Sequence, residues 1–307
     1  VGVKRGCPQG GVLSPLLWCF VVNSLLEEVS QLGIFIQAYA DDVCLLISHK
    51  NLRKVCEQTQ SVLNRLDAWC SRNGLNANPN KTNLVLFTRK RKIAGLVPML
   101  LKGVTLQLSE EVKYLGIILD RKLTWSKHIE EKSSRALTAF WQCRRAFGKT
   151  WGIRPSMVHW MYTMVIRPIL TFGAVVWWPR TTQKTTCKAL NRLQRDACLG
   201  ITGAMRTTPG KALNVILGLL PLDLMIQKVA MKTMFRLRNN GVWIHKPVTR
   251  HGTLLDKAIK HNPMLDMPVD DSPTMVRFGS KYSVKLPSRS EWDNSDSLLN
   301  DFTHVLY

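Results

Sequence analysis

The sequence has 307 residues, 45% hydrophobic and 21% charged, which excludes a globally disordered chain and leaves room for one large domain or two smaller ones. Its 43 Lys and Arg residues outnumber 21 Asp and Glu residues, and the net charge of +22 predicts a polyanionic partner, with nucleic acid favoured over a membrane surface. The eight cysteines form no C-x-x-C pair and no apolar run is long enough to span a bilayer, so neither a zinc centre nor a transmembrane protein is predicted.

The chain opens without Met and without a signal peptide, so we expect an internal fragment of an intracellular protein with reduced cysteines. The first predicted elements are a helix and a β-hairpin. Ser14 followed by Pro15 is typical of a helix start, and Gly33 suits its end. Two short β-forming runs flank Tyr39-Ala40-Asp41-Asp42, which predicts a hairpin with the acidic pair at its turn.

The remaining pattern divides the chain into a mixed part and a helical part. We expect a helix over 51–74, a strand over 83–88, strands around 105–108 and 112–119, and helices over 127–147, 155–165, 185–199 and 211–237. Prolines 168, 179, 209 and 221 are predicted to break the helical part. Past Asn240 the periodicity is lost, so 241–297 is predicted to be a linker or loosely packed, and 301–307 the opening of a strand.

The first predicted helix of the helical part is basic. Between Arg121 and Arg154 many Lys and Arg residues face only Glu130 and Glu131. A basic face on an amphipathic helix suits a groove that follows a phosphate backbone. An ordinary solvated face is the alternative, and the shortage of acids favours the groove.

The adjacent carboxylates Asp41 and Asp42 are the strongest chemical signal. They repel one another unless a cation or hydrogen-bond donors offset their charge, and hard oxygen ligands suit Mg²⁺. In nucleotidyl transfer, two such ions about 3.5 to 4 Å apart assist the attacking and the departing oxygens. Because Asp is also common in turns for local hydrogen bonding, the pair alone is weak support for this reading.

A second segment strengthens the acidic turn. Pro8-Gln9-Gly10-Gly11 leads into Leu13-Ser14-Pro15 about thirty residues upstream. The two glycines permit close approach of the backbone to a bulky ligand, and Gln9 offers both a donor and an acceptor. A turn in a purely structural loop would not need the flanking residues.

Together these segments resemble the reverse transcriptases of non-LTR retrotransposons, whose palm has a Gly-x-Pro-Gln-Gly-x-x-Leu-Ser-Pro segment followed by a Tyr/Phe-Ala-Asp-Asp turn. Two further segments are similar to that family: Gly74-Leu75-Asn76 with Asn80-Lys81-Thr82, and Val112-Lys113-Tyr114-Leu115-Gly116. The stretch from Ile201 to Leu222 resembles the thumb-side region of jockey-like elements and of type-1 elements that insert in ribosomal DNA. The resemblance covers about residues 1–237.

The resemblance implies roles for particular residues. It makes Asp41 and Asp42 metal ligands and catalytic residues, with Mg²⁺ as the cofactor and Mn²⁺ as its substitute, and Lys81 the general acid toward pyrophosphate. It places Pro8, Gln9 and Gly10 along the template and incoming nucleotide and Tyr39 at the primer terminus or in packing. Tyr114, Leu115 and Gly116 would form the primer grip.

The resemblance also implies an architecture. We expect an α+β fold with a partial polymerase palm and its primer-grip hairpin over 1–120, a helical thumb and thumb-adjacent region over 121–240, and 241–307 as a linker to a truncated C-terminal domain, with RNase H as a candidate. A further catalytic aspartate and the fingers are expected upstream of Val1. We therefore expect this segment by itself to lack polymerase activity.

The expected parent polyprotein copies retrotransposon RNA by target-primed reverse transcription and carries an endonuclease. Its partners would be an RNA template, a DNA primer or target and dNTPs, with no membrane. It would act in the nucleus after synthesis in the cytoplasm. Two alternatives stay open: a maturase of a group II intron, disfavoured by the Leu-Gly-Leu-Leu-Pro region, and a non-catalytic remnant that binds nucleic acid.

Overall fold

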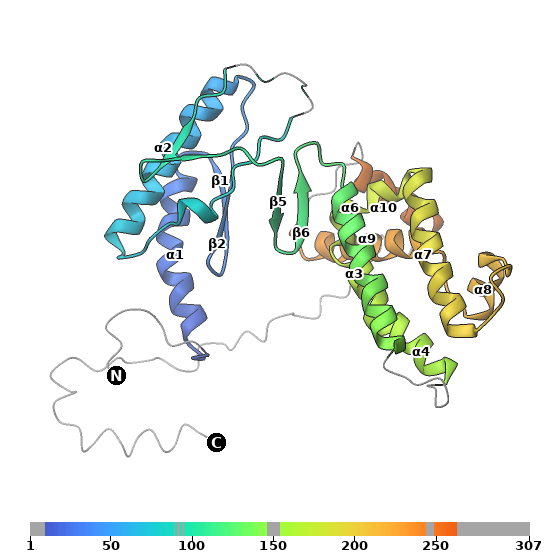
Figure 1. The fold of residues 1–307 in the computed structure, drawn as a ribbon. Coiled ribbons are helices and arrows are strands. Elements are labelled where there is room, and N and C mark those ends of the chain that lie inside the picture. The colour runs from blue at the N-terminus through green and yellow to red at the C-terminus, as the bar shows by residue number, and fades with distance from the viewer. Residues whose placement is uncertain are drawn as a thin grey trace, which may run out of the picture. The chain divides into compact units, whose positions relative to one another are not determined.

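Helices and short β-hairpins share the described residues up to 120, and the elements described after residue 120 are helical (Figure 1). The structure, a computed structural model, describes residues 10–88, 90, 93, 95–145, 154–243 and 249–262. Within these residues the strands form three separate two-stranded antiparallel sheets, β1–β2, β3–β4 and β5–β6. The α+β prediction is thus confirmed at the level of mixed helices and small antiparallel sheets.

The first module contains a helix, a hairpin and a second helix: α1 (Ser14–Ser30), β1 (Phe35–Tyr39), β2 (Asp42–Leu46) and α2 (Leu52–Arg72). Asn51 caps α2 by accepting a hydrogen bond from the backbone N–H of Arg53. Helix α1 begins at Ser14 itself, after Leu13, so Ser14 is its first residue and not the residue before it.

The core of this module lies between the two helices and one face of the hairpin. Leu25 and Val29 of α1 meet Val62 and Trp69 of α2 with almost no exposed surface, and alternate residues of the hairpin pack against them. This burial follows from the period of two along a strand, which turns every second side chain to the same face. The opposite face of the hairpin is therefore free for other contacts.

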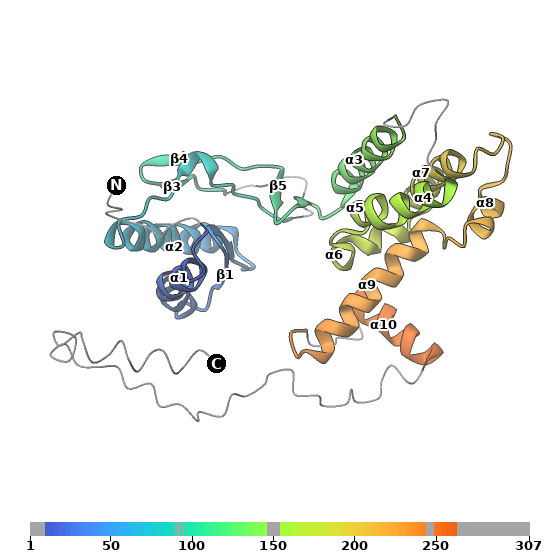
Figure 2. The same ribbon diagram turned by 90° about the horizontal axis from the view of Figure 1, so that it is seen from below.

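A second side of α2 holds the hairpin of β3 (Met99–Leu101) and β4 (Val104–Leu106), which runs along it (Figure 2). Two hydrogen bonds attach this hairpin to the Gln60 amide, which accepts from Leu100 N–H at 2.7 Å and donates to Leu100 C=O at 2.9 Å. The predicted strand over 83–88 is wrong in extent. Only Leu84 forms an isolated bridge, to Leu108, after the 3₁₀ turn η1 (Pro79–Lys81).

The third hairpin, β5 (Glu111–Tyr114) and β6 (Ile117–Asp120), leads into the helical region. That region contains the following helical segments: α3 (Ser126–Arg145), α4 (Pro155–Met161), η2 (Tyr162–Ile166), α5 (Arg167–Thr171), α6 (Ala174–Trp177), η3 (Trp178–Thr182), α7 (Lys184–Thr202), α8 (Gly210–Ile216) and α9 (Leu222–Asn239). Their shared core contains the fully buried Tyr162, Trp177 and Ile226.

Two expectations for the later chain are corrected. Pro168 was predicted to break the helix, but the chain stays helical through it because the preceding turn η2 is a wider π-helix. The predicted linker contains a helix, α10 (Arg250–His261), whose Leu255 is fully buried. The contacts divide the chain into Val1–Leu255 and Asp256–Tyr307, and the boundaries near 120 and 240 stay predictions. The expected strand over 301–307 lies outside the described residues.

No single helix in the described ranges has the length and apolar character of a membrane span, although a bent pair, Pro155–Thr171 with Ala174–Thr182, reaches both when taken together. All seven cysteines that the structure describes are free thiols.

Candidate functional site

The acidic pair lies at the tip of the β1–β2 hairpin, as its sequence predicts. Tyr39 pairs with Asp42 at the end of the ladder, and Ala40 and Asp41 form the two-residue loop. Because paired residues of an antiparallel ladder share a face, the side chains of Tyr39 and Asp42 project together on the face that does not pack on the core. Asp41 and Asp42 are exposed, and Tyr39 is 63% exposed.

The backbone of the loop has an uncommon conformation. Ala40 has a φ of 52°, a left-handed value that L-residues with a Cβ rarely adopt. The indole N–H of Trp18, from α1, donates a hydrogen bond of 2.6 Å to the Ala40 carbonyl. Sequence reasoning missed Trp18, because nothing in its local pattern tells that its indole meets a residue 22 positions away.

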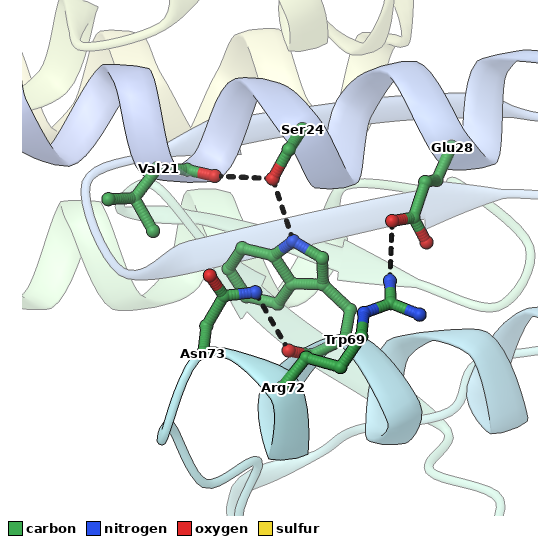
Figure 3. A network of polar contacts seen from close by, with 6 residues as sticks. All are labelled: Val21, Ser24, Glu28, Trp69, Arg72 and Asn73. Atoms are coloured by element: carbon green, nitrogen blue, oxygen red, sulfur yellow. Dashed lines mark hydrogen bonds and ion pairs between the residues drawn. The ribbon is translucent and has the colours of Figure 1, made fainter.

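Helix α1 is itself held in place by α2. Figure 3 shows the indole N–H of Trp69 donating to Ser24 Oγ at 2.8 Å and Arg72 pairing with Glu28 at 2.5 Å. Ser24 in turn donates to the Val21 carbonyl, so the hydroxyl is both acceptor and donor. The helix that carries Trp18 is thus held by burial and by polar contacts with α2.

The two carboxylates form a small donor set. In the described part of the chain no group of three or more His, Cys, Asp or Glu side chains could enclose a metal ion. Two exposed carboxylates nevertheless suit Mg²⁺, which usually keeps several waters and is held by one or two carboxylates together with substrate phosphates. The chemistry of the donor set therefore fits a divalent cation shared with a phosphate ligand.

The other predicted site residues lie on different elements. Pro8 and Gln9 fall outside the described residues. Gly10 has a φ of 84°, and a Cβ there would meet no atom within 4 Å, so its backbone conformation, and not crowding, favours glycine. Lys81 is the exposed last residue of η1. No interaction described for this part of the chain links Lys81 to the acidic turn.

Tyr114 of β5 is electrostatically coupled to the acidic hairpin. Burial raises the pKa of the Tyr114 hydroxyl, and the nearby Cys44 and Asp42 of β2 raise it further. Cys44 and Asp42 belong to alternate positions of β2, so they share a face of the hairpin. The structure therefore brings Tyr114 of the Val112–Gly116 segment close to Asp42.

The tip of the β5–β6 hairpin, Leu115 and Gly116, packs on the helical region. A Cβ on Gly116 would lie 3.1 Å from the Phe172 ring, and a Cβ on Gly173 would lie 2.7 Å from Cδ1 of Ile117. Leu115 and Gly116 both have positive φ, 46° and 79°. The two glycines therefore allow a close approach between the hairpin and the corner that joins α5 to α6.

His128 of α3 connects the β6 strand of the same hairpin to the helical region. It is fully buried, and its Nδ1 accepts a hydrogen bond of 3.2 Å from the Ile118 backbone N–H. Burial first, and then the positive charge of Lys132, lowers the pKa of His128 to about 4, so the ring is neutral at pH 7. Lys132 lies 4.6 Å from the centre of the Phe172 ring, in a cation–π contact.

The helical region presents ordered rows of cations. Exposed Lys184, Lys188 and Arg192 follow one another at four-residue spacing along α7. Exposed Lys228, Lys232 and Arg236 do the same along α9. None of these six takes part in the ion pairs found among the described residues: Arg72–Glu28, Lys102–Asp67, Lys113–Glu131, Arg121–Glu110, Lys127–Glu111 and Arg135–Glu131. Like charges at this spacing destabilise a helix in isolation, which points to a polyanionic ligand.

Comparison with known proteins shows what the chain is similar to. Residues 2–119 match the family model described as reverse transcriptase (RNA-dependent DNA polymerase). The chain is 28% identical over 301 residues to a retrovirus-related Pol polyprotein from type-1 retrotransposable element R1 of Bradysia coprophila, covering 96% of this chain and 28% of that protein. No solved structure matches.

Two other similar proteins also come from transposable elements. The R1 Pol polyprotein of Nasonia vitripennis is 24% identical over 224 residues, which is 71% of this chain and 66% of that protein. The RNA-directed DNA polymerase from mobile element jockey of Drosophila melanogaster is 27% identical over 248 residues, which is 76% of this chain and 26% of that protein. The chain thus spans less than two thirds of the length of each. The reverse transcriptase family model thus matches residues 2–119, and the chain is similar over most of its length to proteins of R1 and jockey elements.

Proposed function

We propose that this chain is the palm-containing part of an RNA-directed DNA polymerase, and that nucleotidyl transfer takes place at the tip of the β1–β2 hairpin. The observation that supports this most directly is the exposed pair Asp41 and Asp42 at the end of a two-residue turn, inside the segment that matches the reverse transcriptase family. Phosphoryl transfer asks a protein mainly for position and charge neutralisation, which carboxylates on a short hairpin can supply.

The proposed cofactor is a pair of Mg²⁺ ions, replaceable by Mn²⁺. When bound, these ions would neutralise the phosphates and activate the attacking hydroxyl. Asp41 and Asp42 would hold them against the nucleotide. Tyr39 shares the exposed face with Asp42 and would touch the primer end or the nucleotide. Pro8, Gln9 and Gly10 would lie along the template, and Lys81 would protonate pyrophosphate if it approaches in the complex.

The β5–β6 hairpin is proposed to hold the primer. Its tip residue Gly116 packs against Phe172 of the helical region, and Tyr114 is close enough to Asp42 for the charge to raise its pKa. A primer held by this hairpin would thus lie near the acidic turn. We propose that the helical region has the role of a thumb.

The RNA template and DNA primer are proposed to follow the cation rows of α7 and α9. A rise of about 6 Å per four helical residues spaces the charges regularly along each helix, and the six side chains have no acidic partners among the described ion pairs. Each cation that neutralises a phosphate steepens the dependence of binding on salt. Target-primed synthesis in the nucleus, with an endonuclease elsewhere in the parent polyprotein, is proposed from the relationship to R1 and jockey elements.

The metal site can be tested with Fe²⁺, which substitutes for Mg²⁺ and cuts the backbone next to its site in the presence of ascorbate and peroxide. We expect cleavage of the 307-residue chain at residues 40–42, protection by excess Mg²⁺, and loss of cleavage in Asp41→Asn and Asp42→Asn. The matched control is Glu57→Gln, an exposed acid of α2, which should leave cleavage unchanged.

The same preparation should bind an RNA–DNA primer–template and dNTP more tightly with Mg²⁺ than without it. A chain that binds nucleic acid equally well with and without metal, and is not cut at the turn, would be a nucleic-acid-binding remnant, and the polymerase proposal would fall. DNA synthesis by the 307-residue chain alone would establish the polymerase and overturn the expectation that the segment needs its parent protein.

A further inference from the structure

We infer that Trp18 is a positioning residue of the acidic turn, and that its indole N–H sets the conformation from which Asp41 and Asp42 project. The inference rests on the proposed function only in assigning cation binding to these carboxylates. The hydrogen bond and the conformation of the turn are properties of the fold itself.

The turn needs an external support. A two-residue hairpin loop whose first residue has positive φ normally places glycine there, because a Cβ makes that conformation strained. Here the first loop residue is Ala40, with a φ of 52°. Ala40 and Asp41 are exposed, so no surrounding core holds them in place. A strained backbone conformation persists only where neighbouring structure determines it.

Trp18 provides that support from a rigid element. Its indole N–H donates to the Ala40 carbonyl at 2.6 Å, which is a short distance for this kind of hydrogen bond. About two and three turns further along α1, Leu25 and Val29 are almost completely buried against α2. The indole of Trp18 therefore belongs to a helix that is fixed in the core of the module.

The hydrogen bond acts directly on the peptide unit before Asp41. Because the peptide bond is planar, the Ala40 carbonyl and the Asp41 N–H lie in one plane. Holding that carbonyl fixes the plane and so limits the direction in which the Asp41 side chain leaves the backbone. Loss of the anchor would let the loop sample other conformations, and the two carboxylates would spend less time in the arrangement that binds a cation.

The chain offers a matched control. Trp69 also donates its indole N–H to a group of α1, Ser24 Oγ, at 2.8 Å, and this hydrogen bond does not involve the turn (Figure 3). Trp18→Phe and Trp69→Phe each remove one indole N–H and keep an aromatic ring. A third variant, Trp18→Phe with Ala40→Gly, restores access to the left-handed conformation without the anchor.

Mn²⁺ is the probe, and the full 307-residue chain is the sample. We expect Trp18→Phe to weaken Mn²⁺ binding about three- to tenfold, the range that the net contribution of one hydrogen bond allows. We expect Trp69→Phe to lower the unfolding midpoint and leave Mn²⁺ affinity unchanged. Adding Ala40→Gly to Trp18→Phe should recover most of the lost affinity, which a general loss of stability would not do.

Backbone NMR shifts of Ala40 and Asp41 separate this inference from the proposed function. A change of these shifts in Trp18→Phe but not in Trp69→Phe supports the anchor. Unchanged shifts in Trp18→Phe overturn it, whatever happens to metal binding. Changed shifts, combined with Mn²⁺ binding that Asp41→Asn does not weaken, would support the anchor and refute the proposed metal site.

Discussion

The β1–β2 and β5–β6 hairpins have loops of the same length, and both loops contain a residue with positive φ. They differ in what stabilises that conformation. In both loops the first residue has positive φ, 52° at Ala40 and 46° at Leu115. In β5–β6 the second loop residue is Gly116, also at positive φ, and this pair of conformations suits the twist of a hairpin. In β1–β2 that second place belongs to Asp41.

The comparison shows where each turn obtains its stability. The β5–β6 turn has a glycine and is pressed against Phe172, so local chemistry and packing agree. The β1–β2 turn has no glycine and is open to solvent, and its conformation depends on one indole from α1. A turn that is proposed to bind a cation through its carboxylates cannot also bury them, so a neighbouring element has to fix its conformation.

The largest effect is expected where the packed hairpin meets the helices. Gly173→Ala places a Cβ in a left-handed residue, φ 61°, and 2.7 Å from Cδ1 of Ile117. The backbone strain costs about 1–2 kcal/mol, and displacement of Ile117 from its rotamer adds about 0.5–1.5 kcal/mol. We expect the free energy of unfolding in urea to fall by about 2–3 kcal/mol.

The control is Gly203→Ala, which has a similar φ of 68° but no atom within 4 Å of the new Cβ. It should show the backbone cost alone. If the free energy of unfolding fell equally in the two variants, the contact between β6 and the α5–α6 corner would not contribute to stability. The proposed difference between the two hairpins would then be wrong.

The next effect concerns the buried attachment of β6 through His128. Its folded-state pKa of about 4 lies below its ordinary value of 6.5, so between these values the unfolded chain takes up a proton that the folded chain excludes. The contribution of the neutral ring is complete above pH 6.5 and is lost as the pH falls through this window. We expect the free energy of unfolding to drop by about 2 kcal/mol from this group between pH 7 and pH 5.

His128→Gln cannot titrate and can still accept from Ile118 N–H. Its unfolding free energy, measured in urea at both pH values, should therefore fall by correspondingly less than that of the wild type. An identical pH dependence in both proteins would show that the ring takes up its proton as readily in the folded chain as in the unfolded chain. The hydrogen bond from Ile118 N–H would then not depend on a neutral ring.

The smallest effect is expected in the acidic turn. Ala40→Gly relieves about 1–2 kcal/mol of left-handed strain and loses about 0.5–1 kcal/mol to the greater freedom of the unfolded chain. We expect a net stabilisation of about 0.5–1 kcal/mol, visible as a higher urea midpoint. Leu115→Gly likewise relieves left-handed strain and increases the freedom of the unfolded chain, but it also removes a side chain that is only 38% exposed. It should therefore gain less stability than Ala40→Gly, or lose stability. A gain in Leu115→Gly that equals the gain in Ala40→Gly would contradict the proposed difference between the turns.

The parts of the fold with strong local signals were predictable. The two short β-forming runs around Tyr-Ala-Asp-Asp predicted the hairpin, and helical spacing predicted a helix over 51–74 where α2 lies. The strand over 83–88 was wrong, because β-forming residues become a strand only when a partner pairs with them, and only Leu84 finds one. Helix α10 was missed because its apolar stripe is short.

The place of the acidic pair at a hairpin turn was predictable, but the contacts that support the turn were not. The acidic pair and the Tyr114 motif were identified by residue type and order. Trp18, His128 and Gly173 act through contacts between residues distant in the chain, and an isolated Trp, His or Gly carries no sign of its partner. The roles predicted for all of the site residues, Lys81, Pro8 and Gln9 among them, stay predictions.

The π-turn η2 has a consequence for how this helix can tolerate changes in length. The Arg167 N–H donates to the Tyr162 carbonyl, five residues back, just before Pro168, which has no N–H to donate. Such a turn holds one residue more than an α-helical turn would, and one residue corresponds to about 100° of rotation. Deleting a residue here would restore regular winding and swing α4 by that angle relative to α5, so the extra residue sets which side of α4 meets α7.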